Sequence, residues 1–363
     1  MQNDIYDIAI IGLGPSGSTL ARLLNNKYKV VALDKCGETN LGFTKPCGGL
    51  LAPDAQKALA EFNLTLPKSI LVDPQIFSVK TIDIDANITR HYQRFYLNLD
   101  RFEFDKWLRS LIPKSVDVFL GSKCLSIARQ ESSAGSIFMV NFIDCNGARL
   151  TIFAKIIVGA DGANSIVRRT LLSNSKAQKN KIRFRTSIQQ WFTDVSLTPF
   201  YSCIFDSETT DTYAWALTKG SYFIFGGAFN PKNAKADFEK LKLKLIEKGF
   251  KLDNPIKTEA CQVTYSNNKF FLGASNAFLI GEAAGFVSPS SYEGISYALQ
   301  SSKILANVLN CEIKTTAHNK IYYKKTNKLR QKIRSKSLKA KIIYSPFLRK
   351  LILKSKISSI NTD

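Results

Sequence analysis

The chain has 363 residues, of which 45% are hydrophobic, so it can bury a large core and form one or two domains. Only two histidines occur, His91 and His318, which argues against a Ser-His-Asp hydrolase and against a multi-histidine metal site. The seven cysteines are scattered and include no CxxC pair, so we expect reduced thiols rather than a disulfide framework or a zinc site. The chemistry is therefore expected to come from a cofactor.

The formal net charge is +22, and it is unevenly distributed along the chain. Residues 313–363 hold 15 Lys and Arg residues and a single acid, Asp363. The chain shows neither a signal-peptide pattern at its start nor the run of about 18 apolar residues that a membrane span needs. We expect a cytoplasmic protein whose basic charge belongs mainly to its C-terminal segment.

Residues 6–34 carry the order of elements that a dinucleotide site requires. An apolar strand enters a turn with Gly12, Gly14 and Gly17, and a second strand ends at Asp34. Gly12 makes the tight turn, Gly14 lets the backbone approach a pyrophosphate, and Gly17 lets helix and strand pack closely. The pyrophosphate would sit at the helix start, and the Asp34 carboxylate would accept the ribose hydroxyls of an adenosine.

The rest of the chain alternates between helix and strand patterns. A helix is expected at about 53–62, and another begins after Asp100, a candidate N-cap whose capping box Glu103 would complete. Further helices are expected at about 234–249 and from 293–295 onward. The predicted strands are 76–85, 90–97, 116–128, 136–144, 149–158, 182–192, 201–205, 213–218, 221–225 and 276–281.

These patterns predict an α/β fold, in which a Rossmann-like nucleotide-binding domain built from discontinuous segments carries an inserted β-rich substrate domain and a helical C-terminal tail. A ligand cleft is expected between the two domains. The predicted segments are 1–75, 99–181 and 266–312 for the nucleotide-binding domain, 76–98 and 182–265 for the substrate domain, and 313–363 for the tail.

Two later motifs identify the dinucleotide by resemblance. The segment from Gly159 through Asp161 to Arg168 resembles the Asp-Gly motif of flavin monooxygenase-type proteins. The segment from Leu279 to Gly285 resembles the second FAD motif of the same superfamily, at the spacing that the superfamily shows. The resemblance implies FAD as the cofactor.

Within that superfamily, three matches resemble the geranylgeranyl reductase family. They are Lys45-Pro46-Cys47-Gly48-Gly49-Leu50, Tyr213-Ala214-Trp215-Ala216-Leu217 with Gly226-Gly227 after it, and the run from Gly285 to Ile295. The resemblance covers residues 5–305. Three departures are visible: Glu282 stands for the usual Asp, Ser290-Ser291-Tyr292 for Leu-Thr-Gly, and Leu217-Thr218 for Phe-Pro. These departures bear on the substrate rather than on the fold.

By this resemblance, Ser16 and Asp34 contact the pyrophosphate and the adenosine ribose, and Arg101 contacts the FAD phosphates. The Cys124 backbone contacts the adenine, and Glu282 holds ribityl or pyrophosphate oxygens. Arg101 and Glu282 also have simpler interpretations, as a solvated arginine at a helix start and as an acid favoured by the helix dipole. The expected cofactor contacts are Gly12, Gly14, Pro15, Ser16, Gly17, Asp34, Lys35, Pro46, Cys47, Gly48, Arg101, Cys124, Asp161, Gly281, Glu282, Gly294 and Ile295.

Three residues are candidates for direct catalytic roles. Cys47 lies in a loop expected against the isoalloxazine, where it would position flavin or donate a proton to substrate; an inert, packed thiol is the alternative. Tyr213 and Trp215 share one strand face and would line a hydrophobic slot, or simply pack in the core. Gly294 and Ile295 would aim a helix N-terminus at the flavin pyrimidine edge and stabilise the reduced anion.

Apolar residues recur at helical spacing from about 319 to 345, and basic residues fill the rest, before Pro346 ends the run. With the apolar stretch that follows, residues 319–353 suit an anionic membrane surface, such as the inner face of the cell membrane. A helix covering the core with a solvated lysine face is the alternative. Nucleic-acid binding is disfavoured, because no recognised nucleic-acid module accompanies the charge. The apolar positions are Tyr322, Leu329, Ile333, Ala340 and Ile343.

The resemblance implies an FAD-dependent reductase that saturates double bonds in a prenyl chain or a related apolar molecule. A flavin monooxygenase or halogenase acting on an aromatic or apolar small molecule is the alternative. A non-catalytic flavoprotein recruited through its basic tail is a third interpretation. No second glycine fingerprint is present, so the electron donor would be transiently bound NAD(P)H, a ferredoxin or another flavoprotein.

Overall fold

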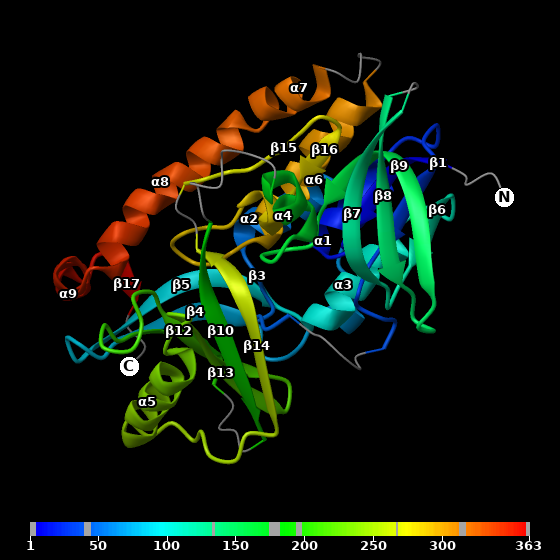
Figure 1. The fold of residues 1–363 in the computed structure, drawn as a ribbon. Coiled ribbons are helices and arrows are strands. Elements are labelled where there is room, and N and C mark those ends of the chain that lie inside the picture. Colours follow the sequence, from blue (N-terminus) through cyan, green and yellow to red (C-terminus); the bar gives the residue numbers. More distant parts are fainter. Residues whose placement is uncertain are drawn as a thin grey trace.

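The computed structural model describes residues 5–39, 45–132, 135–173, 182–193, 198–265, 268–311 and 317–360. Two β-sheets lie side by side, with helices packed around them (Figure 1). The predicted fold class, α/β with a Rossmann-like unit and a β-rich unit, is confirmed.

The first sheet forms around the N-terminal strand, whose apolar run gives it a buried centre. Five of its strands follow the order β6, β2, β1, β9 and β16 in parallel, with β7 and β8 joined to β9 as an antiparallel meander and β15 paired to β16. Its strands are β1 (Ile5–Ile11), β2 (Val30–Leu33), β6 (Val116–Phe119), β7 (Lys123–Ser132), β8 (Gly135–Ile143), β9 (Arg149–Gly159), β15 (Gly273–Ala274) and β16 (Ala277–Leu279).

The second sheet draws strands from two separate parts of the chain. The order is β14, β10, β13, β12, β11, β4, β5 and β17, with β3 paired to β5. All neighbours are antiparallel except β11 and β4. Its strands are β3 (Leu50–Leu51), β4 (Ile76–Asp83), β5 (Ile88–Asn98), β10 (Arg183–Phe192), β11 (Phe200–Phe205), β12 (Ala214–Lys219), β13 (Tyr222–Phe229), β14 (Lys257–Tyr265) and β17 (Ser359–Ile360).

The helices pack their apolar faces on these sheets. Helix α5 covers one face of the second sheet through Phe238, which stacks on Phe225 with ring centroids 5.0 Å apart. Helices α1 and α6 pack against each other beside the first sheet. The described helices are α1 (Pro15–Leu23), α2 (Pro53–Ala60), α3 (Arg101–Ser110), α4 (Ile166–Ser173), α5 (Ala234–Glu247), α6 (Ile295–Asn310), α7 (His318–Lys325), α8 (Asn327–Tyr344) and α9 (Pro346–Ser355), with 3-10 turns η1 (Lys68–Ile70) and η3 (Gly281–Ala284).

Two local predictions need correction. The strand predicted at 116–128 is two strands, because β6 joins the parallel sheet whereas β7 pairs with β8 in the meander.

At the start of α3, the predicted N-cap is confirmed. The Asp100 carboxylate accepts hydrogen bonds from the backbone N–H of Phe102 and Glu103 at 2.8 and 3.0 Å. The capping box is wrong, because the Asp100 N–H donates instead to the carbonyl of Ile70 at 2.8 Å.

The C-terminal prediction also changes. The helix expected at 319–345 is divided at Thr326 into α7 and α8. It ends before Pro346 as predicted, since α8 stops at Tyr344 and Ser345 is extended, but Pro346 then begins a further helix, α9. The predicted apolar stripe faces the protein: Tyr322, Leu329 and Ile333 join the core of the first sheet. This stripe is therefore a packing surface.

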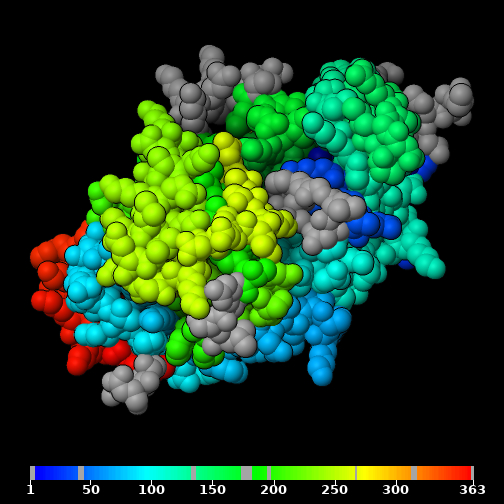
Figure 2. Space-filling model, turned by 90° about the horizontal axis from the view of Figure 1, so that it is seen from below, coloured from blue at the N-terminus to red at the C-terminus, as the bar shows by residue number. Residues whose placement is uncertain are grey.

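The three C-terminal helices run along one side of the molecule from the first sheet to the second (Figure 1). The Tyr322 hydroxyl donates to the carbonyl of Leu279 in the first sheet at 3.0 Å. At the other end, the Arg349 guanidinium donates to the carboxylates of Asp83 and Asp85 at 2.8 and 2.7 Å. Figure 2 shows these C-terminal residues beside the β4–β5 hairpin. Among the described residues, no helix has the length and apolar content of a bilayer span.

Candidate functional site

A cavity of about 1130 Å³ lies between the two sheets and is lined by residues from both. It brings together segments that are far apart in the chain. The predicted site residues that line it are Gly12, Gly14, Pro15, Ser16, Asp34, Lys35, Pro46, Cys47, Gly48, Arg101, Cys124, Asp161, Tyr213, Trp215, Glu282, Gly294 and Ile295. Gly17 and Gly281 are not among its lining residues.

These two glycines act in backbone packing. A Cβ on Gly17 would lie 1.8 Å from the carbonyl oxygen of Gly12, so no side chain fits there. Gly281 has a φ of +56°, and a Cβ on it would lie 2.9 Å from the Ser16 hydroxyl oxygen. Gly12, with a φ of +99°, makes the turn against Ala160. The glycines thus hold the first dinucleotide loop against the two later motifs.

The start of α1 is open toward the cavity. Gly14 is its N-cap, no side chain caps the helix, and a Cβ on Gly14 would meet no atom within 4 Å. The first amides of a helix lack intrahelical acceptors and carry a partial positive charge, which suits a phosphate group. This open cradle fits the pyrophosphate of a dinucleotide.

Asp34 directly follows β2 and is buried, with 9% of the residue exposed. One carboxylate oxygen accepts the backbone N–H of Leu13, and the other accepts that of Cys36 at 2.7 Å. Burial raises the pKa of Asp34, and these two hydrogen bonds act against that shift. The amide bonds orient the carboxylate at the wall of the cavity, where lone pairs remain for ribose hydroxyls.

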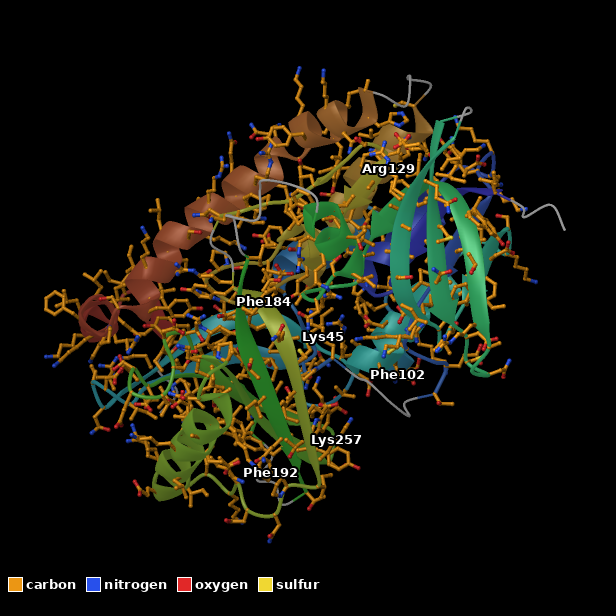
Figure 3. The ribbon with its side chains drawn as sticks, viewed as in Figure 1. Lys45, Phe102, Arg129, Phe184, Phe192 and Lys257 are labelled. Atoms are coloured by element: carbon orange, nitrogen blue, oxygen red, sulfur yellow. The ribbon has the colours of Figure 1, made fainter. Side chains whose placement is uncertain are left out.

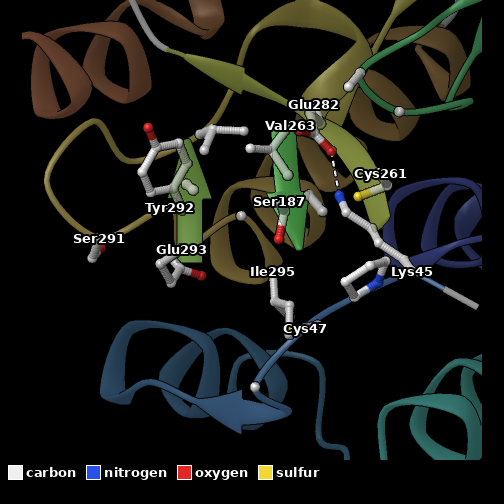
Figure 4. A pocket seen from close by; sticks show the side chains of 18 of the residues that line it. Lys45, Cys47, Ser187, Cys261, Val263, Glu282, Ser291, Tyr292, Glu293 and Ile295 are labelled. Atoms are coloured by element: carbon white, nitrogen blue, oxygen red, sulfur yellow. Dashed lines mark hydrogen bonds and ion pairs between the residues drawn. The ribbon is translucent and has the colours of Figure 1, made fainter. Parts of the chain in front are cut away.

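Glu282 is the residue that departs from the usual Asp, and its longer side chain is fully engaged. One carboxylate oxygen pairs with the Lys45 ammonium, and the other accepts the backbone N–H of Thr264 at 2.9 Å (Figure 4). Burial lowers the pKa of Lys45, but the Glu282 carboxylate outweighs burial and raises it overall. Lys45 projects between the second sheet and α3 (Figure 3), so this ion pair ties the loop before Cys47 to the second FAD-like motif.

Arg101 forms a fork with the Asp105 carboxylate one turn along α3, at 3.0 and 3.2 Å. Burial lowers the pKa of Arg101, while Asp105 and the nearby Cys47 sulfur raise it more strongly. The guanidinium is therefore permanently charged beside Cys47. This arrangement differs from a solvated helix-start arginine, because the side chain is only 17% exposed.

Behind the Cys47 loop lies Lys219, a buried cation that the sequence analysis missed. Its ammonium donates to the carbonyl of Leu99 at 2.6 Å and lies 3.5 Å from that of Gly49. Burial lowers the pKa of Lys219 to about 8, opposed by Cys47 and Asp100. With Arg101, this residue places two cationic groups near the Cys47 side chain.

Cys124 and Asp161 lie near each other in the cavity lining. Burial raises the pKa of Cys124 to about 12, so its thiol stays protonated and unreactive. Asp161 accepts the backbone N–H of Ile166 at 2.7 Å, which caps the segment leading into α4. Arg168 donates to the carbonyls of Ala163 and Ala283 and joins this loop to the second motif.

The other end of the cavity is aromatic. Tyr213 and Trp215 face it with ring centroids 6.0 Å apart. The Trp215 ring can lie flat only because position 226 is glycine, where a Cβ would come within 2.8 Å of the indole. The indole N–H donates to Gln189 at 3.1 Å, and the Tyr213 hydroxyl donates to the carbonyl of Ser291 at 2.8 Å. Both polar atoms are satisfied, so the rings present apolar surface.

Three more lining residues, Tyr92, Arg94 and Tyr96, alternate along β5. Because side chains two residues apart share one face of a strand, this alternation is the sequence signal that could have placed these three residues together. Glu293 also lines the cavity just before α6 (Figure 4). Its carboxylate accepts the N–H and the hydroxyl of Ser296 at 2.7 and 2.8 Å, which caps α6.

The sequence relatives of this chain align with nearly all of it. No model of a known protein family matches it. It is 48% identical over 360 residues to "Protein CbrA" of Escherichia coli O9:H4 (strain HS), covering 98% of this chain and 94% of that protein. The chain belongs to the CbrA family. The CbrA protein of E. coli K12 is 47% identical, with 98% of each chain covered.

Solved structures share the fold of this CbrA-family chain. A geranylgeranyl bacteriochlorophyll reductase-like protein from Thermoplasma acidophilum has a TM-score of 0.72 at 20% identity, covering 99% of this chain and 89% of that one. PqsL of Pseudomonas aeruginosa, in complex with 2-aminobenzoylacetate, has a TM-score of 0.72 at 16% identity, with coverages of 98% and 100%. The myxobacterial FAD-dependent halogenase CndH has a TM-score of 0.67 at 16% identity, with coverages of 99% and 84%. FAD-dependent enzymes among these neighbours agree with the FAD prediction.

Proposed function

We propose that this CbrA-family chain is an FAD-dependent oxidoreductase that reduces carbon–carbon double bonds of an apolar, prenyl-like substrate. The observation that carries the proposal is the continuity of the cavity. It runs from the open α1 cradle and Asp34, past Cys47, to the rings of Tyr213 and Trp215. A dinucleotide seated at the first end would bring its reactive ring toward the loop of Cys47, facing an apolar slot.

Bound FAD, once reduced by a donor such as NAD(P)H, a ferredoxin or another flavoprotein, would supply the hydride that saturates one alkene carbon. Cys47 would give a proton to the other carbon, so that two hydrogens are added in total. Arg101 and Lys219 would then stabilise the resulting thiolate until solvent reprotonates it. Tyr213 and Trp215 would hold the chain in line and exclude water.

Gly294 and Ile295 have a supporting part in this proposal. Both line the cavity at the start of α6. A helix N-terminus there would stabilise negative charge on a reduced ring. Glu293 already binds the Ser296 amide, so the amide of Ile295 is the donor that we assign to this task.

A second candidate is an FAD-dependent monooxygenase or halogenase. It is supported by neighbours of that kind whose TM-scores, 0.72 for PqsL and 0.67 for CndH, are close to that of the reductase-like protein. Against it stands the Lys45–Leu50 loop, which resembles the corresponding loop of the geranylgeranyl reductase family.

The deciding experiment reduces the purified protein and incubates it with a cellular lipid extract, with and without oxygen, while masses are recorded. An oxygen-independent gain of two hydrogens per step supports the reductase. Incorporation of an oxygen atom, seen only in air, replaces it with the monooxygenase. A flavoprotein whose reduced form changes no lipid in either condition is the third outcome, and it favours a non-catalytic role.

The role of Cys47 has its own test. In Cys47→Ala, flavin content and flavin reduction should match the wild type, while product formation slows by about 100-fold or more, as expected for loss of a general acid. Cys124→Ala serves as the matched control, since that buried thiol is expected to be inert. Equal rates for Cys47→Ala and the wild type would assign Cys47 to packing.

A further inference from the structure

The strongest unused feature is the outer face of α9. Four apolar side chains lie on one stripe of this helix and point to solvent: Phe347 is 69% exposed, Leu348 39%, Leu351 51% and Ile352 43%. Their spacing puts all four on the same face. We call this set the α9 patch.

The α9 patch belongs to a firmly held helix. On the opposite face, Arg349 is 5% exposed and donates to Asp83 and Asp85, and Leu353 is 3% exposed. Arg90 on β5 donates to the carbonyl of Leu353 at 3.1 Å. A helix so anchored cannot turn its apolar stripe inward, so the stripe stays exposed in the folded protein.

Positive charge surrounds the α9 patch. Lys350, Lys354 and Lys356 are exposed on or directly after the helix, and residues 313–362 contain no Asp or Glu. The end of α8 extends the same character, because Leu338 and Ile342 are 64% and 41% exposed beside the exposed Lys341. An apolar stripe among lysines is the pattern of a helix that lies in the surface of an anionic bilayer.

The cavity opens at this place. Ile352 of the α9 patch also lines the cavity. Leu353, Arg94 and Lys339, which lie outside the patch, line the cavity too. Because Ile352, Arg94 and Lys339 are exposed as well, they mark an opening beside α9. A substrate leaving the bilayer at the α9 patch would enter the aromatic end of the cavity without crossing water.

We propose that the α9 patch docks this protein on an anionic lipid bilayer and loads its substrate from that bilayer. The loading part rests on the proposed reductase function, whereas the docking part does not. A second copy of the chain fits less well, since lysines would face lysines. A helix of 10 residues is also only about 15 Å long, too short to supply by itself the roughly 800 Å² per partner of a stable interface.

The test uses the purified full-length flavoprotein and vesicles of phosphatidylcholine with or without phosphatidylglycerol. We expect co-flotation with the anionic vesicles, weakened by salt. Phe347→Gln/Leu351→Gln should reduce the partition coefficient by about tenfold or more, and Lys350→Gln/Lys354→Gln should reduce it on anionic vesicles only. Glutamine keeps the helix propensity, so α9 should remain folded.

The matched control is Leu243→Gln/Ile256→Gln, which removes side chains that are 62% and 55% exposed at or near α5. It should bind vesicles as the wild type does. Equal binding by the α9 variant and this control, or no binding by the wild type, overturns the proposal. So does a concentration-dependent dimer that the α9 variant abolishes.

The docking result is independent of the chemistry. Flavin absorbance and substrate reduction are followed in the same fractions. If the protein floats with vesicles but reduces no substrate, the docking proposal stands and the reductase proposal is wrong. Conversely, reduction of a detergent-dispersed prenyl substrate by a protein that never floats leaves the reductase standing and removes the α9 proposal.

Discussion

At the dinucleotide end of the cavity, glycine backbone shapes much of the surface, whereas aromatic side chains form the other end. Gly12, Gly14 and Gly17 shape the first end through turns and open amides. Tyr213 and Trp215 shape the second through their rings. At Gly12 and Gly17 the backbone leaves no room for a Cβ, while a site formed by side chains can change its contents by substitution.

This difference accounts for where the family resemblance is strong and where it departs. Positions that backbone geometry dictates allow one residue type, so the glycine spacing keeps its pattern. Two of the three departures, Ser290–Tyr292 and Leu217–Thr218, lie at or next to the aromatic slot, whereas the third, Glu282, lies in the second FAD-like motif. One scaffold can therefore keep its cofactor end and serve several substrates.

The largest expected effect is at Gly17. Gly17→Ala should lower the free energy of unfolding by about 3 kcal/mol or more, because its Cβ would lie 1.8 Å from the Gly12 carbonyl oxygen. Urea unfolding measures it. A change below about 1 kcal/mol would show that the loop can move apart and that the backbone end is softer than we describe.

Gly14→Ala is the companion of that variant, since a Cβ there meets no atom within 4 Å. Its free energy of unfolding should change by less than about 1 kcal/mol. Flavin affinity should nevertheless fall by about tenfold or more, because the methyl group would occupy the pyrophosphate cradle. Flavin retained at wild-type affinity would contradict the placement of the pyrophosphate.

An intermediate effect is expected at Lys219, which lies between the two ends. Its pKa is lowered by burial from 10.5 to about 8, so between these pH values the unfolded chain binds a proton that the folded protein does not. Stability should therefore rise with pH across this window, by at most about 3 kcal/mol. Lys219→Met should lack the rise.

The measurement compares urea unfolding of wild type and Lys219→Met at pH 7 and about pH 10. Between pH 7 and the higher pH, the free energy of unfolding should rise more for the wild type than for Lys219→Met. Lys320→Met is the control, because that lysine is exposed on α7 and lies outside the cavity. Parallel pH profiles for wild type and Lys219→Met would mean that Lys219 stays charged in the folded protein.

The smallest effect is expected at Tyr213. Tyr213→Phe removes the hydrogen bond from the hydroxyl to the Ser291 carbonyl and keeps the ring, so stability should fall by about 1 kcal/mol. Substrate binding should change little if the ring face is what matters. Thermal unfolding and substrate affinity test this, with Tyr222→Phe, 38% exposed, as the control. A large loss of activity would assign the hydroxyl to the reaction.

The dinucleotide end could be predicted from sequence because its parts are close together in the chain. Strand β1, helix α1 and strand β2 form one βαβ unit, and the spacing from Gly12 to Asp34 alone predicts the turn, the helix start and the acid. The substrate end could not be predicted in the same way. Tyr92, Tyr213 and Tyr292 come from distant segments that meet only after β4, β11 and β12 pair.

The cationic parts of the site show the same limit. Lys219 and Arg349 stand in ordinary strand and helix patterns, and their burial depends on partners elsewhere in the chain, at Leu99 and Asp83. The helical spacing of apolar residues in the C-terminal segment predicts which face of the helices is buried, but not which surface covers that face. The protein core, and not a membrane, covers that face.

One more consequence concerns the border of the second sheet. Strand β5 is flanked on its outer side by two very short strands, with Leu50–Leu51 paired to Leu97 and Asn98, and Ser359–Ile360 paired to His91 and Tyr92. Short partners of this kind deny an exposed edge to other chains, which guards against strand-to-strand aggregation. Since β3 follows the Cys47 loop directly, the pairing that keeps the protein from aggregating also anchors one end of that loop.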